Sequence, residues 1–362
     1  MVSSPTRHVV RCPACGRVSS SDGLYCDRCG MMAIVPTGST YAGKYQIERL
    51  VAEGGMGRIY KGIEQRSGRT AAIKECLEER DWKNDKRQLY TETFKREAGI
   101  LTELQMIRAV PQLFEGVSRW NGRHFFVMEF IEGDNLLDVI ERRNKPFAWE
   151  LVVEWATRLC QVLDVLHRHR PDPIIYRDLK LENIVFRTAG SLDEDIVLLD
   201  FGIARQVDTG RHATRLAGSK GYAPKEQAVS GKPETRSDLY SLAVCMHQLL
   251  TNRDPAEDPP PFPAARRLNP AVPQWLSDLI DINLSEEPRE RYESADEMRE
   301  DLKQRRVTST LRCGKCGAEN ERSLIYCRQC AMVLLTTPRS CSHCADFIPA
   351  NSRYCPRCGK AA

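Results

Sequence analysis

Six Cys-x-x-Cys pairs, confined to the two ends of the chain, constrain its fold more than any other feature. They contain twelve of the fifteen cysteines and form three sets of four. In every set, ten residues separate the second cysteine from the third. The sets are Cys12, Cys15, Cys26 and Cys29; Cys313, Cys316, Cys327 and Cys330; and Cys341, Cys344, Cys355 and Cys358. A spacing that occurs three times indicates an internal repeat with units of about 20 residues.

Units of this size cannot fold on a hydrophobic core alone. Ordering about 20 residues costs roughly 1.5 kcal/mol per residue, or about 30 kcal/mol in all. Four thiolates bound to Zn²⁺ contribute an apparent ~10–16 kcal/mol, which a few packed side chains supplement. We therefore predict three structural zinc sites. Disulfides are the alternative, but residues 1–10 have no apolar signal-peptide core, which favours a cytoplasmic protein with reduced cysteines.

Two further expectations concern side chains next to the cysteines. His343 lies between Cys341 and Cys344 and is an alternative zinc ligand, although we expect its ring to be exposed. A tyrosine precedes the third cysteine of each set, and we expect these rings to cover the metal. The three tyrosines are Tyr25, Tyr326 and Tyr354.

The three sets resemble zinc ribbons, one at the N-terminus and two in tandem at the C-terminus. Residues 312–360 carry eight basic and three acidic side chains, a formal charge of +5. Each zinc with four thiolates has a formal charge of −2, so two sites reduce this sum to +1. The N-terminal set falls from +2 to zero in the same way. Because nucleic-acid binding requires a surplus of positive charge, we expect protein partners rather than nucleic acid.

The 263 residues from Lys44 to Arg306 form a segment of different composition. The whole chain of 362 residues is 41% apolar with a net charge of +4, which excludes a disordered protein and allows two or three domains. No stretch approaches the roughly 20 unbroken apolar residues of a membrane span. The three cysteines of the segment are expected to pack as small hydrophobes. They are Cys76, Cys160 and Cys245.

The pattern of apolar residues in this segment predicts strands first and helices later. The charged span 78–93 has no period and is expected to be a solvated loop, with a helix beginning near Thr93. Expected strands cover 45–51, 57–63, 71–74 and 124–130, and further helices cover 148–169 and 235–250. This order indicates an α+β protein of two lobes.

A glycine cluster and a buried lysine stand out among the strands. Residues 53–59 read Glu-Gly-Gly-Met-Gly-Arg-Ile, and such glycines let backbone amides close over phosphates. Lys74 ends an apolar strand and needs a partner for its charge. Glu97 has apolar residues at −3, +3, +4 and +7, which place it on the buried face of its helix. We therefore predict an ion pair between Lys74 and Glu97.

The densest set of polar side chains lies at residues 178–183. Asp178, Lys180 and Asn183 occur within six residues, and Asp200 ends a later apolar strand. Asn183 and Asp200 offer the hard oxygen ligands that Mg²⁺ prefers. Asp178 is then left to orient and deprotonate a hydroxyl group.

Together these segments resemble a protein kinase, and most of all the bacterial eukaryotic-like serine/threonine kinases, over about 263 residues. The resemblance implies the bilobal kinase fold, with an N-lobe at 44–131 and a C-lobe at 132–306. It implies that Lys74, paired with Glu97, holds the ATP phosphates, while Asn183 and Asp200 bind Mg²⁺. Asp178 is implied as the catalytic base and Lys180 as the group that stabilises the transferring phosphoryl.

The resemblance also implies the residues around the nucleotide. The Glu129 carbonyl and the Ile131 amide would read the adenine edge beyond a gatekeeper at Met128, and Ala72 and Val185 would sandwich the ring. The remaining contacts would come from the glycine-rich loop and its strands: Val51, Ala52, Gly54, Gly55, Gly57 and Ile59.

Some positions depart from the family pattern. Ala52 replaces the first loop glycine, Tyr176 stands where histidine is commoner, and Leu181 replaces proline. Pro-Lys-Glu at 224–226 replaces Ala-Pro-Glu. All six charged or amide groups of the implied catalytic set are present, so we expect an active enzyme.

The helical part of the kinase-like segment supports three further expectations. Glu226 should pair with Arg291, and Asp238 should support the catalytic loop. The activation segment should be autophosphorylated, placing a phosphate near Arg177. The candidate hydroxyls are Thr209, Thr214 and Ser219.

These inferences combine into one hypothesis: an ATP-dependent serine/threonine protein kinase with zinc ribbons that dock partners or regulate activity. The expected layout is a ribbon at 1–36, a linker at 37–43, the kinase domain at 44–306, a linker at 307–311 and tandem ribbons at 312–362. The alternative is a catalytically weak pseudokinase that serves as a scaffold through its ribbons. The sequence leaves the oligomeric state open.

Overall fold

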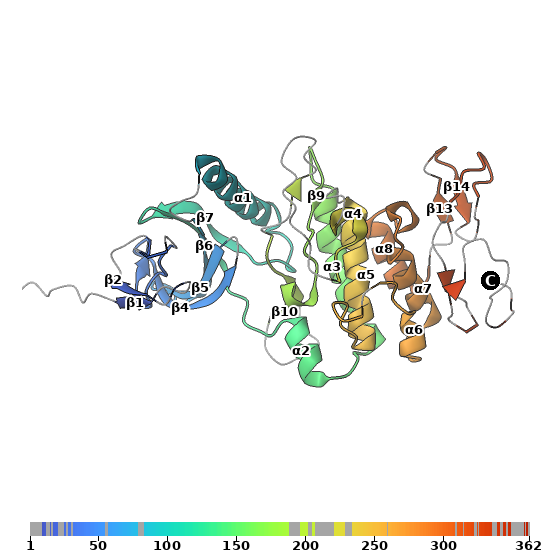
Figure 1. Cartoon of the computed structure of the whole chain (residues 1–362), viewed down its shortest axis with the longest axis horizontal. Helices are drawn as coiled ribbons and strands as arrows, with labels where there is room; N and C mark the ends of the chain where they lie inside the picture. Colours follow the sequence, from blue (N-terminus) through green and yellow to red (C-terminus); the bar gives the residue numbers. More distant parts are fainter. Residues whose placement is uncertain are drawn as a thin grey trace, which may run out of the picture. The chain divides into compact units, whose positions relative to one another are not determined.

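The computed structural model divides the chain into two compact units (Figure 1). The first consists of residues 1–132 with 199–202, and the second of residues 133–198 with 203–362. The structure describes residues 9–11, 15, 17–20, 25–26, 28–29, 32–54, 57–78, 83–187, 196–201, 205–206, 221–228, 234–258, 260–307, 310–313, 315–321, 324, 326–334, 339–340, 343–344, 347–348, 358 and 360.

The first unit is built on an antiparallel sheet of six strands in the order β3-β4-β5-β6-β8-β7. The expected strands are present, and β4 extends to the glycine cluster, where Gly54 pairs with Gly57. The strands are β3 (Thr40–Tyr41), β4 (Tyr45–Gly54), β5 (Gly57–Glu64), β6 (Thr70–Cys76), β7 (Leu113–Trp120) and β8 (Arg123–Glu129). A separate hairpin pairs β1 (Val9–Arg11) with β2 (Val18–Ser20), and the first cysteine pair lies between these two strands in the sequence.

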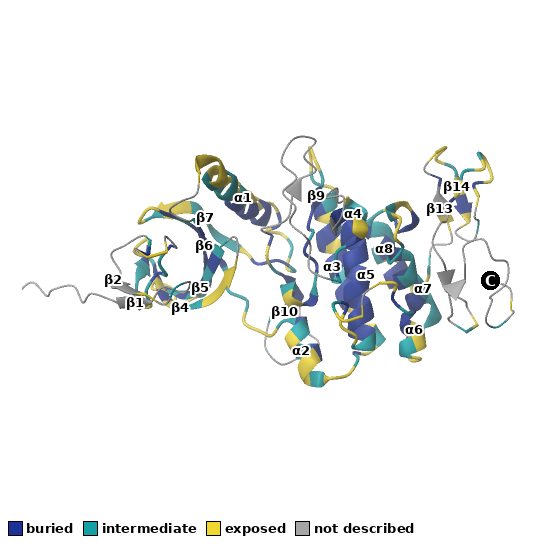
Figure 2. Ribbon diagram, in the orientation of Figure 1, coloured by how far each residue is buried: buried dark blue, intermediate teal, exposed yellow. Residues whose placement is uncertain are grey.

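Both faces of the central strand β6 are covered. Six of its seven residues are buried, and Figure 2 shows this inner part of the sheet in dark blue. On one face an aromatic core forms around Tyr41, Tyr60 and Phe125, and Val35, from the segment that precedes the sheet, packs into it. On the other face Phe126 packs against Phe94 of the helix α1.

Helix α1 (Asn84–Glu103) corrects one prediction. The expected loop at 78–93 is helical from residue 84, about nine residues before the predicted start. Its buried residues all lie in the second half, from Phe94 to Leu101, so the first half shows no apolar period. That half is rich in charged and polar side chains that favour helix intrinsically, and it extends the helix into solvent.

The second unit is mainly helical. Helix α5 (Thr235–Thr251) is buried from Ser237 to Leu250 and runs through its centre (Figure 2). It and α3 (Trp149–His167) agree closely with the predicted helices. The other helices are α2 (Leu136–Arg143), α4 (Lys225–Ala228), α6 (Ala265–Leu268), α7 (Gln274–Asn283) and α8 (Ala295–Gln304), with single 3₁₀ turns at Leu181–Asn183 and Pro288–Glu290.

Short antiparallel pairs complete the second unit. Strands β9 (Ile174–Ile175) and β12 (Arg205–Gln206) pair, as do β10 (Ile184–Phe186) and β11 (Ile196–Leu198). The C-terminal cysteine sets contain two hairpins, β13 (Thr310–Arg312) with β14 (Glu319–Glu321) and β15 (Arg339–Ser340) with β16 (Phe347–Ile348). Among the helices of the described ranges, none is long and apolar enough to cross a bilayer.

Candidate active site and cysteine clusters

The glycine-rich turn lies between β4 and β5. A Cβ atom on Gly57 would lie 2.6 Å from the Glu75 carbonyl oxygen of β6, so only glycine fits there. Val51 and Ala52 are exposed on the β4 side, and Ile59 pairs directly with both Ala52 and Lys74. Directly paired residues of an antiparallel sheet point to the same face. Gly54 is described and open to solvent, whereas Gly55 lies outside the described residues.

Lys74 of β6 forms the predicted ion pair with Glu97 of α1. The distance from Lys74 Nζ to Glu97 Oε1 is 2.5 Å, and the distance to Asp200 Oδ1 is 3.1 Å. Burial opposes the charge of Lys74, but the two carboxylates outweigh it and raise its pKa, so the side chain stays an ammonium. Asp200 adopts a left-handed conformation with φ +55°, an unusual backbone geometry that is concentrated at functional sites.

The positions of the first unit that are predicted to contact adenine lie on β6, at the end of β8 and directly after it. Ala72 pairs with Met128, and both are buried. The amide of Glu129 donates to the Gln112 carbonyl over 2.7 Å, which fixes the start of the segment that leads to Ile131.

Asp178, Lys180 and Asn183 come together in the second unit. Asn183 donates from Nδ2 to Asp178 Oδ2 over 2.9 Å and to the Asp178 carbonyl over 2.8 Å. Lys180 Nζ lies 3.2 Å from Asp178 Oδ2. Because the amide nitrogen of Asn183 binds Asp178, its amide oxygen is the atom suited to a hard cation such as Mg²⁺.

Asp238 supports this loop from the buried helix α5, as predicted. Its Oδ2 accepts from the Tyr176 amide over 2.9 Å, and its Oδ1 accepts from the Arg177 amide over 2.8 Å. Tyr176 is fully buried, which agrees with a packing role. His167 also contacts this carboxylate, with its Nε2 2.8 Å from Asp238 Oδ2, and was not predicted. A histidine in the last turn of a predicted helix gave no signal for this contact.

Two more contacts hold helix α4, and one of them connects it to the loop that leads to Asp178. Arg291 pairs with Glu226 through Nη1–Oε1 and Nη2–Oε2 distances of 2.6 and 3.2 Å, which is the predicted pair in bidentate form. Gln227 donates from Nε2 to the Arg177 carbonyl over 2.6 Å, a contact that the sequence did not suggest. The candidate phosphorylation residues Thr209, Thr214 and Ser219 lie outside the described part of the chain.

Val185 lies close to Gly133, the first residue of the second unit. Val185 is buried in β10. A Cβ atom on Gly133 would lie 2.0 Å from the Phe186 carbonyl oxygen, so the chain passes β10 only because residue 133 is glycine. Gly133 was not predicted as a constrained position, because an isolated glycine has many possible structural roles.

The cysteine set 313–330 forms a compact cluster of four sulfur atoms. All four lie within 4.8 Å of one another, with Sγ–Sγ distances of 3.6 Å for Cys313–Cys330 and for Cys316–Cys327. These distances fit four thiolates around one Zn²⁺, whose Zn–S bonds of about 2.3 Å place sulfur atoms about 3.8 Å apart. They are far longer than a disulfide bond of about 2.05 Å. The residues present therefore fit a zinc site.

The N-terminal set forms the same kind of cluster. Cys15, Cys26 and Cys29 lie together, with Cys15 Sγ 3.6 Å from Cys26 Sγ. Hydrogen bonds from the backbone of Cys29 and Arg28 lower the pKa of Cys26 to about 6, which favours the thiolate that binds metal. Cys12 lies outside the described residues, as do Cys341 and Cys355 of the third set, whose Cys344 and Cys358 are described.

Around the 313–330 cluster, the prediction for the tyrosine is wrong, and an asparagine that was not predicted contacts a cysteine. Tyr326 is 59% exposed and does not cover the sulfur atoms. Asn320, which is 3% exposed, donates from Nδ2 to Cys327 Sγ over 3.5 Å, and its Oδ1 accepts from the Arg328 amide over 2.8 Å. The equivalent positions of the other sets are Ser19 and Ile348, so the repeat gave no signal for this residue.

Comparison with known proteins identifies a family for the central segment and another for the C-terminal segment. The protein kinase domain matches residues 45–303, and the double zinc ribbon matches residues 313–359. The serine/threonine-protein kinase PrkC of Bacillus subtilis is 30% identical over 279 residues, 74% of this chain and 41% of PrkC. The probable serine/threonine-protein kinase CPE1738 of Clostridium perfringens is 27% identical over 297 residues, 78% of this chain and 41% of the relative. The chain thus spans less than half the length of these two relatives.

Solved structures show the same fold. The crystal structure of the Mycobacterium tuberculosis PknI kinase domain matches 75% of this chain and 99% of its own length, with a TM-score of 0.55 at 20% sequence identity. A mutant form of that domain gives a TM-score of 0.56 at 19% identity. At this level of identity the likeness concerns the fold, and it agrees with the strand-rich first unit and the helical second unit.

Proposed function

The chain belongs to the protein kinase family and carries a double zinc ribbon, and on that premise we propose that it transfers the γ-phosphoryl group of ATP to serine or threonine hydroxyls of proteins. The observation that carries the proposal is the position of Lys74, whose ammonium lies between the carboxylates of Glu97 and Asp200. In protein kinases this lysine–glutamate pair accompanies the catalytically competent arrangement of the N-lobe.

Each polar group then has a role that its chemistry allows. Lys74 holds phosphate oxygens, because its raised pKa keeps it charged. Asn183 and Asp200 offer oxygen ligands to Mg²⁺, which neutralises charge on the phosphates when bound. Asp178 accepts the proton of the substrate hydroxyl, and Lys180, 3.2 Å from Asp178, stabilises charge on the transferring group.

Purified full-length protein tests this proposal. Wild type with Mg²⁺, labelled ATP and a generic basic protein substrate should incorporate phosphate into serine or threonine, and Asp178→Asn should abolish incorporation while retaining nucleotide binding. Absence of incorporation by a wild type that binds ATP would favour the scaffold alternative. Mass spectrometry of the same reaction locates autophosphorylation, for which Thr209, Thr214 and Ser219 remain the candidates.

We also propose three structural zinc ions, one for each cysteine set, and ribbons that dock a protein partner. Two sets are clustered among the described residues, and the repeat spacing extends the inference to the third. Elemental analysis should find about three zinc ions per chain. Use of ATP together with a thiolate cluster of the zinc type at Cys313, Cys316, Cys327 and Cys330 fits a cytoplasmic protein.

A further inference from the structure

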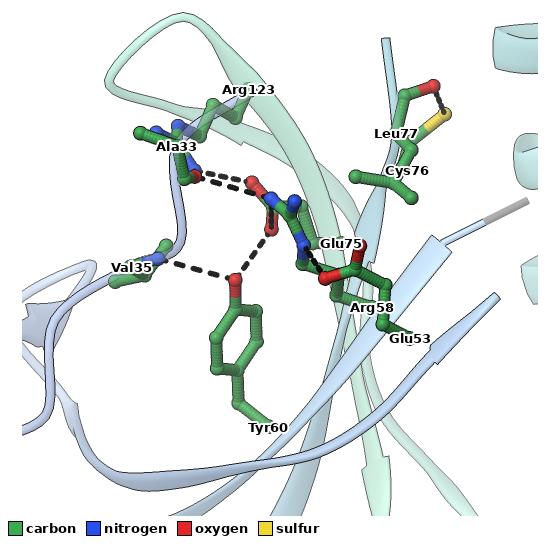
Figure 3. A network of polar contacts seen from close by, with 9 residues as sticks. All are labelled: Ala33, Val35, Glu53, Arg58, Tyr60, Glu75, Cys76, Leu77 and Arg123. Carbon is green, nitrogen blue, oxygen red and sulfur yellow. Dashed lines mark hydrogen bonds and ion pairs between the residues drawn. The ribbon is translucent and has the colours of Figure 1, made fainter. Parts of the chain in front are cut away.

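A group of polar side chains, all buried except Glu53, joins the N-terminal cysteine segment to the kinase sheet (Figure 3). We call this group the ionic network. It consists of Glu53, Arg58, Tyr60, Glu75 and Arg123. The segment that it binds, Ala33 to Val35, follows the last N-terminal cysteine by four to six residues and lies in the same unit as the sheet.

The segment is bound through its main chain. The Ala33 carbonyl accepts from Arg123 Nη1 over 2.6 Å and from Arg58 Nη1 over 3.2 Å. The Val35 amide donates to Tyr60 Oη over 3.2 Å. Main-chain recognition explains why the sequence of residues 33–35, Ala-Ile-Val, contains no polar side chain that would indicate these contacts.

Glu75 lies at the centre of the network. Its Oε1 is 2.6 Å from Arg123 Nη1, its Oε2 accepts from Tyr60 Oη over 2.7 Å, and the same oxygen is 3.7 Å from Arg58 Nη1. Arg58, Tyr60 and Glu75 are 0% exposed. A buried carboxylate with this many partners depends on all of them, because removal of one leaves charge without compensation.

The network also reaches the glycine-rich turn. Arg58 Nε donates to Glu53 Oε2 over 2.7 Å. Glu53 and Arg58 are directly paired across β4 and β5, and the next pair is Gly54 with Gly57. The Glu53–Arg58 ion pair therefore closes the base of the turn that would cover ATP phosphates. On the other side Arg58 pairs in register with Glu75, the residue after Lys74.

The network occupies the face of the sheet opposite to the nucleotide residues. Glu53, Arg58 and Glu75 form one row across three strands, whereas Ala52, Ile59 and Lys74 form the next row. Adjacent rows point to opposite faces. The network thus cannot touch ATP, and any effect on nucleotide binding must pass through the position of the turn.

We propose that Arg58 is a positioning residue for the glycine-rich turn, and that the N-terminal cysteine segment holds it in place, so that loosening this segment weakens ATP binding. The inference rests on the proposed function, because that function makes ATP the ligand of this site. A metal ion bound by Cys15, Cys26 and Cys29 would order the segment. Arg58 connects the segment to the turn, because it bonds both the Ala33 carbonyl and Glu53.

Three variants of the full chain test the proposal. Glu53→Gln removes the ion pair at the base of the turn but keeps the segment bound, and Cys26→Ser weakens the N-terminal cluster. Glu64→Gln is the matched control, because Glu64 is a buried glutamate on the same face of β5 but pairs with Lys44 and Arg69 at the opposite end. Thermal unfolding of each variant verifies that it is folded.

Calorimetric binding of a non-hydrolysable ATP analogue with Mg²⁺ gives the main result. Glu53→Gln and Cys26→Ser should each raise its Kd about three- to tenfold, and the double variant should add little to the larger single effect. In kinetics the KM for ATP should rise while kcat stays within about twofold of wild type. Glu64→Gln should bind like wild type. Unchanged Kd in both test variants, or an equal loss in Glu64→Gln, would overturn the proposal.

Hydrogen exchange of nucleotide-free protein separates this inference from the proposed function. Amides of residues 57–60 should exchange faster in Glu53→Gln and Cys26→Ser than in wild type and Glu64→Gln. If wild type binds no nucleotide, the proposed function fails, and the exchange pattern alone then decides whether the segment holds the turn. Identical exchange in all four proteins would overturn the inference whatever the kinase activity.

Discussion

Asp238 accepts a 2.8 Å hydrogen bond from the backbone amide of Arg177, which is held at φ +72°. A non-glycine residue in this left-handed region is strained, and the strain persists only where the surroundings determine it. The second carboxylate oxygen holds the neighbouring amide of Tyr176 and lies beside His167. One buried carboxylate on α5 thereby determines the main-chain path that leads to Asp178.

We therefore expect Asp238→Asn to reduce kcat about 100-fold with little change in the KM for ATP. The asparagine retains one acceptor oxygen and turns an amino group toward the other backbone amide, so the loop shifts and the free energy of unfolding falls by about 1–3 kcal/mol. Steady-state kinetics and urea unfolding measure the two effects. Asp278→Asn, a carboxyl bonded to Gln274 on α7, is the control and should retain wild-type kcat. A wild-type kcat in Asp238→Asn would contradict the positioning role.

Variants of the Lys74–Glu97 pair should affect stability and catalysis differently. Lys74→Met leaves Glu97 buried beside Asp200 without its cation, and we expect a loss of about 3–5 kcal/mol in the free energy of unfolding. Lys74→Met/Glu97→Leu replaces both charges by apolar groups and should recover most of that loss. Both variants should be inactive. Recovery of phosphoryl transfer in the double variant would show that the pair has no catalytic role.

His247 should make the stability of the second unit depend on pH. Burial lowers its pKa below the ordinary value of 6.5, although its hydrogen bond to the Pro263 carbonyl favours the charged form. The folded state therefore binds the proton less readily than the unfolded state. The stabilising contribution is complete above pH 6.5 and is lost as the pH falls below it, with a slope of at most about 1.4 kcal/mol per pH unit.

Urea unfolding between about pH 5 and pH 8 measures this slope. His247→Gln should flatten the curve below pH 6.5, whereas His169→Gln, at a ring that bonds the Asp172 carbonyl near the surface, should leave it unchanged. Identical curves for wild type and His247→Gln would assign the acid sensitivity to other groups.

Asn320 should govern how firmly the 313–330 cluster holds zinc. Removal of the side-chain donor to Cys327 Sγ in Asn320→Ala should lower zinc affinity about tenfold, because groups that bond to ligand atoms typically contribute this much. Transfer of zinc to a chromophoric chelator measures the change. Arg328→Ala is the control, because it removes a surface side chain that pairs with Glu321 but keeps the backbone amide that donates to Asn320 Oδ1, and it should transfer zinc at the wild-type rate.

Local sequence pattern was sufficient to predict two groups of contacts that the structure contains. The cysteine spacing predicted the 313–330 cluster, because four thiolates at these intervals have few other uses. The Lys74–Glu97 pair followed from helical periodicity, since a carboxylate on an apolar face requires a cation. The predicted start of α1 was wrong, because the first half of this helix faces solvent and shows no periodic pattern of apolar residues.

Motif spacing and periodicity are local properties, so the sequence was sufficient to predict the Lys74–Glu97 pair, the cysteine clusters and the main strands and helices that carry them. Tertiary structure alone decided which distant groups support them. His167 and Asp238 are 71 residues apart, and Ala33 and Arg123 are 90 apart. Ala33 contributes only a carbonyl oxygen, which every residue possesses. A contact made through the main chain leaves no mark on side-chain identity, so only the folded sheet reveals that the N-terminal segment reaches the base of the glycine-rich turn.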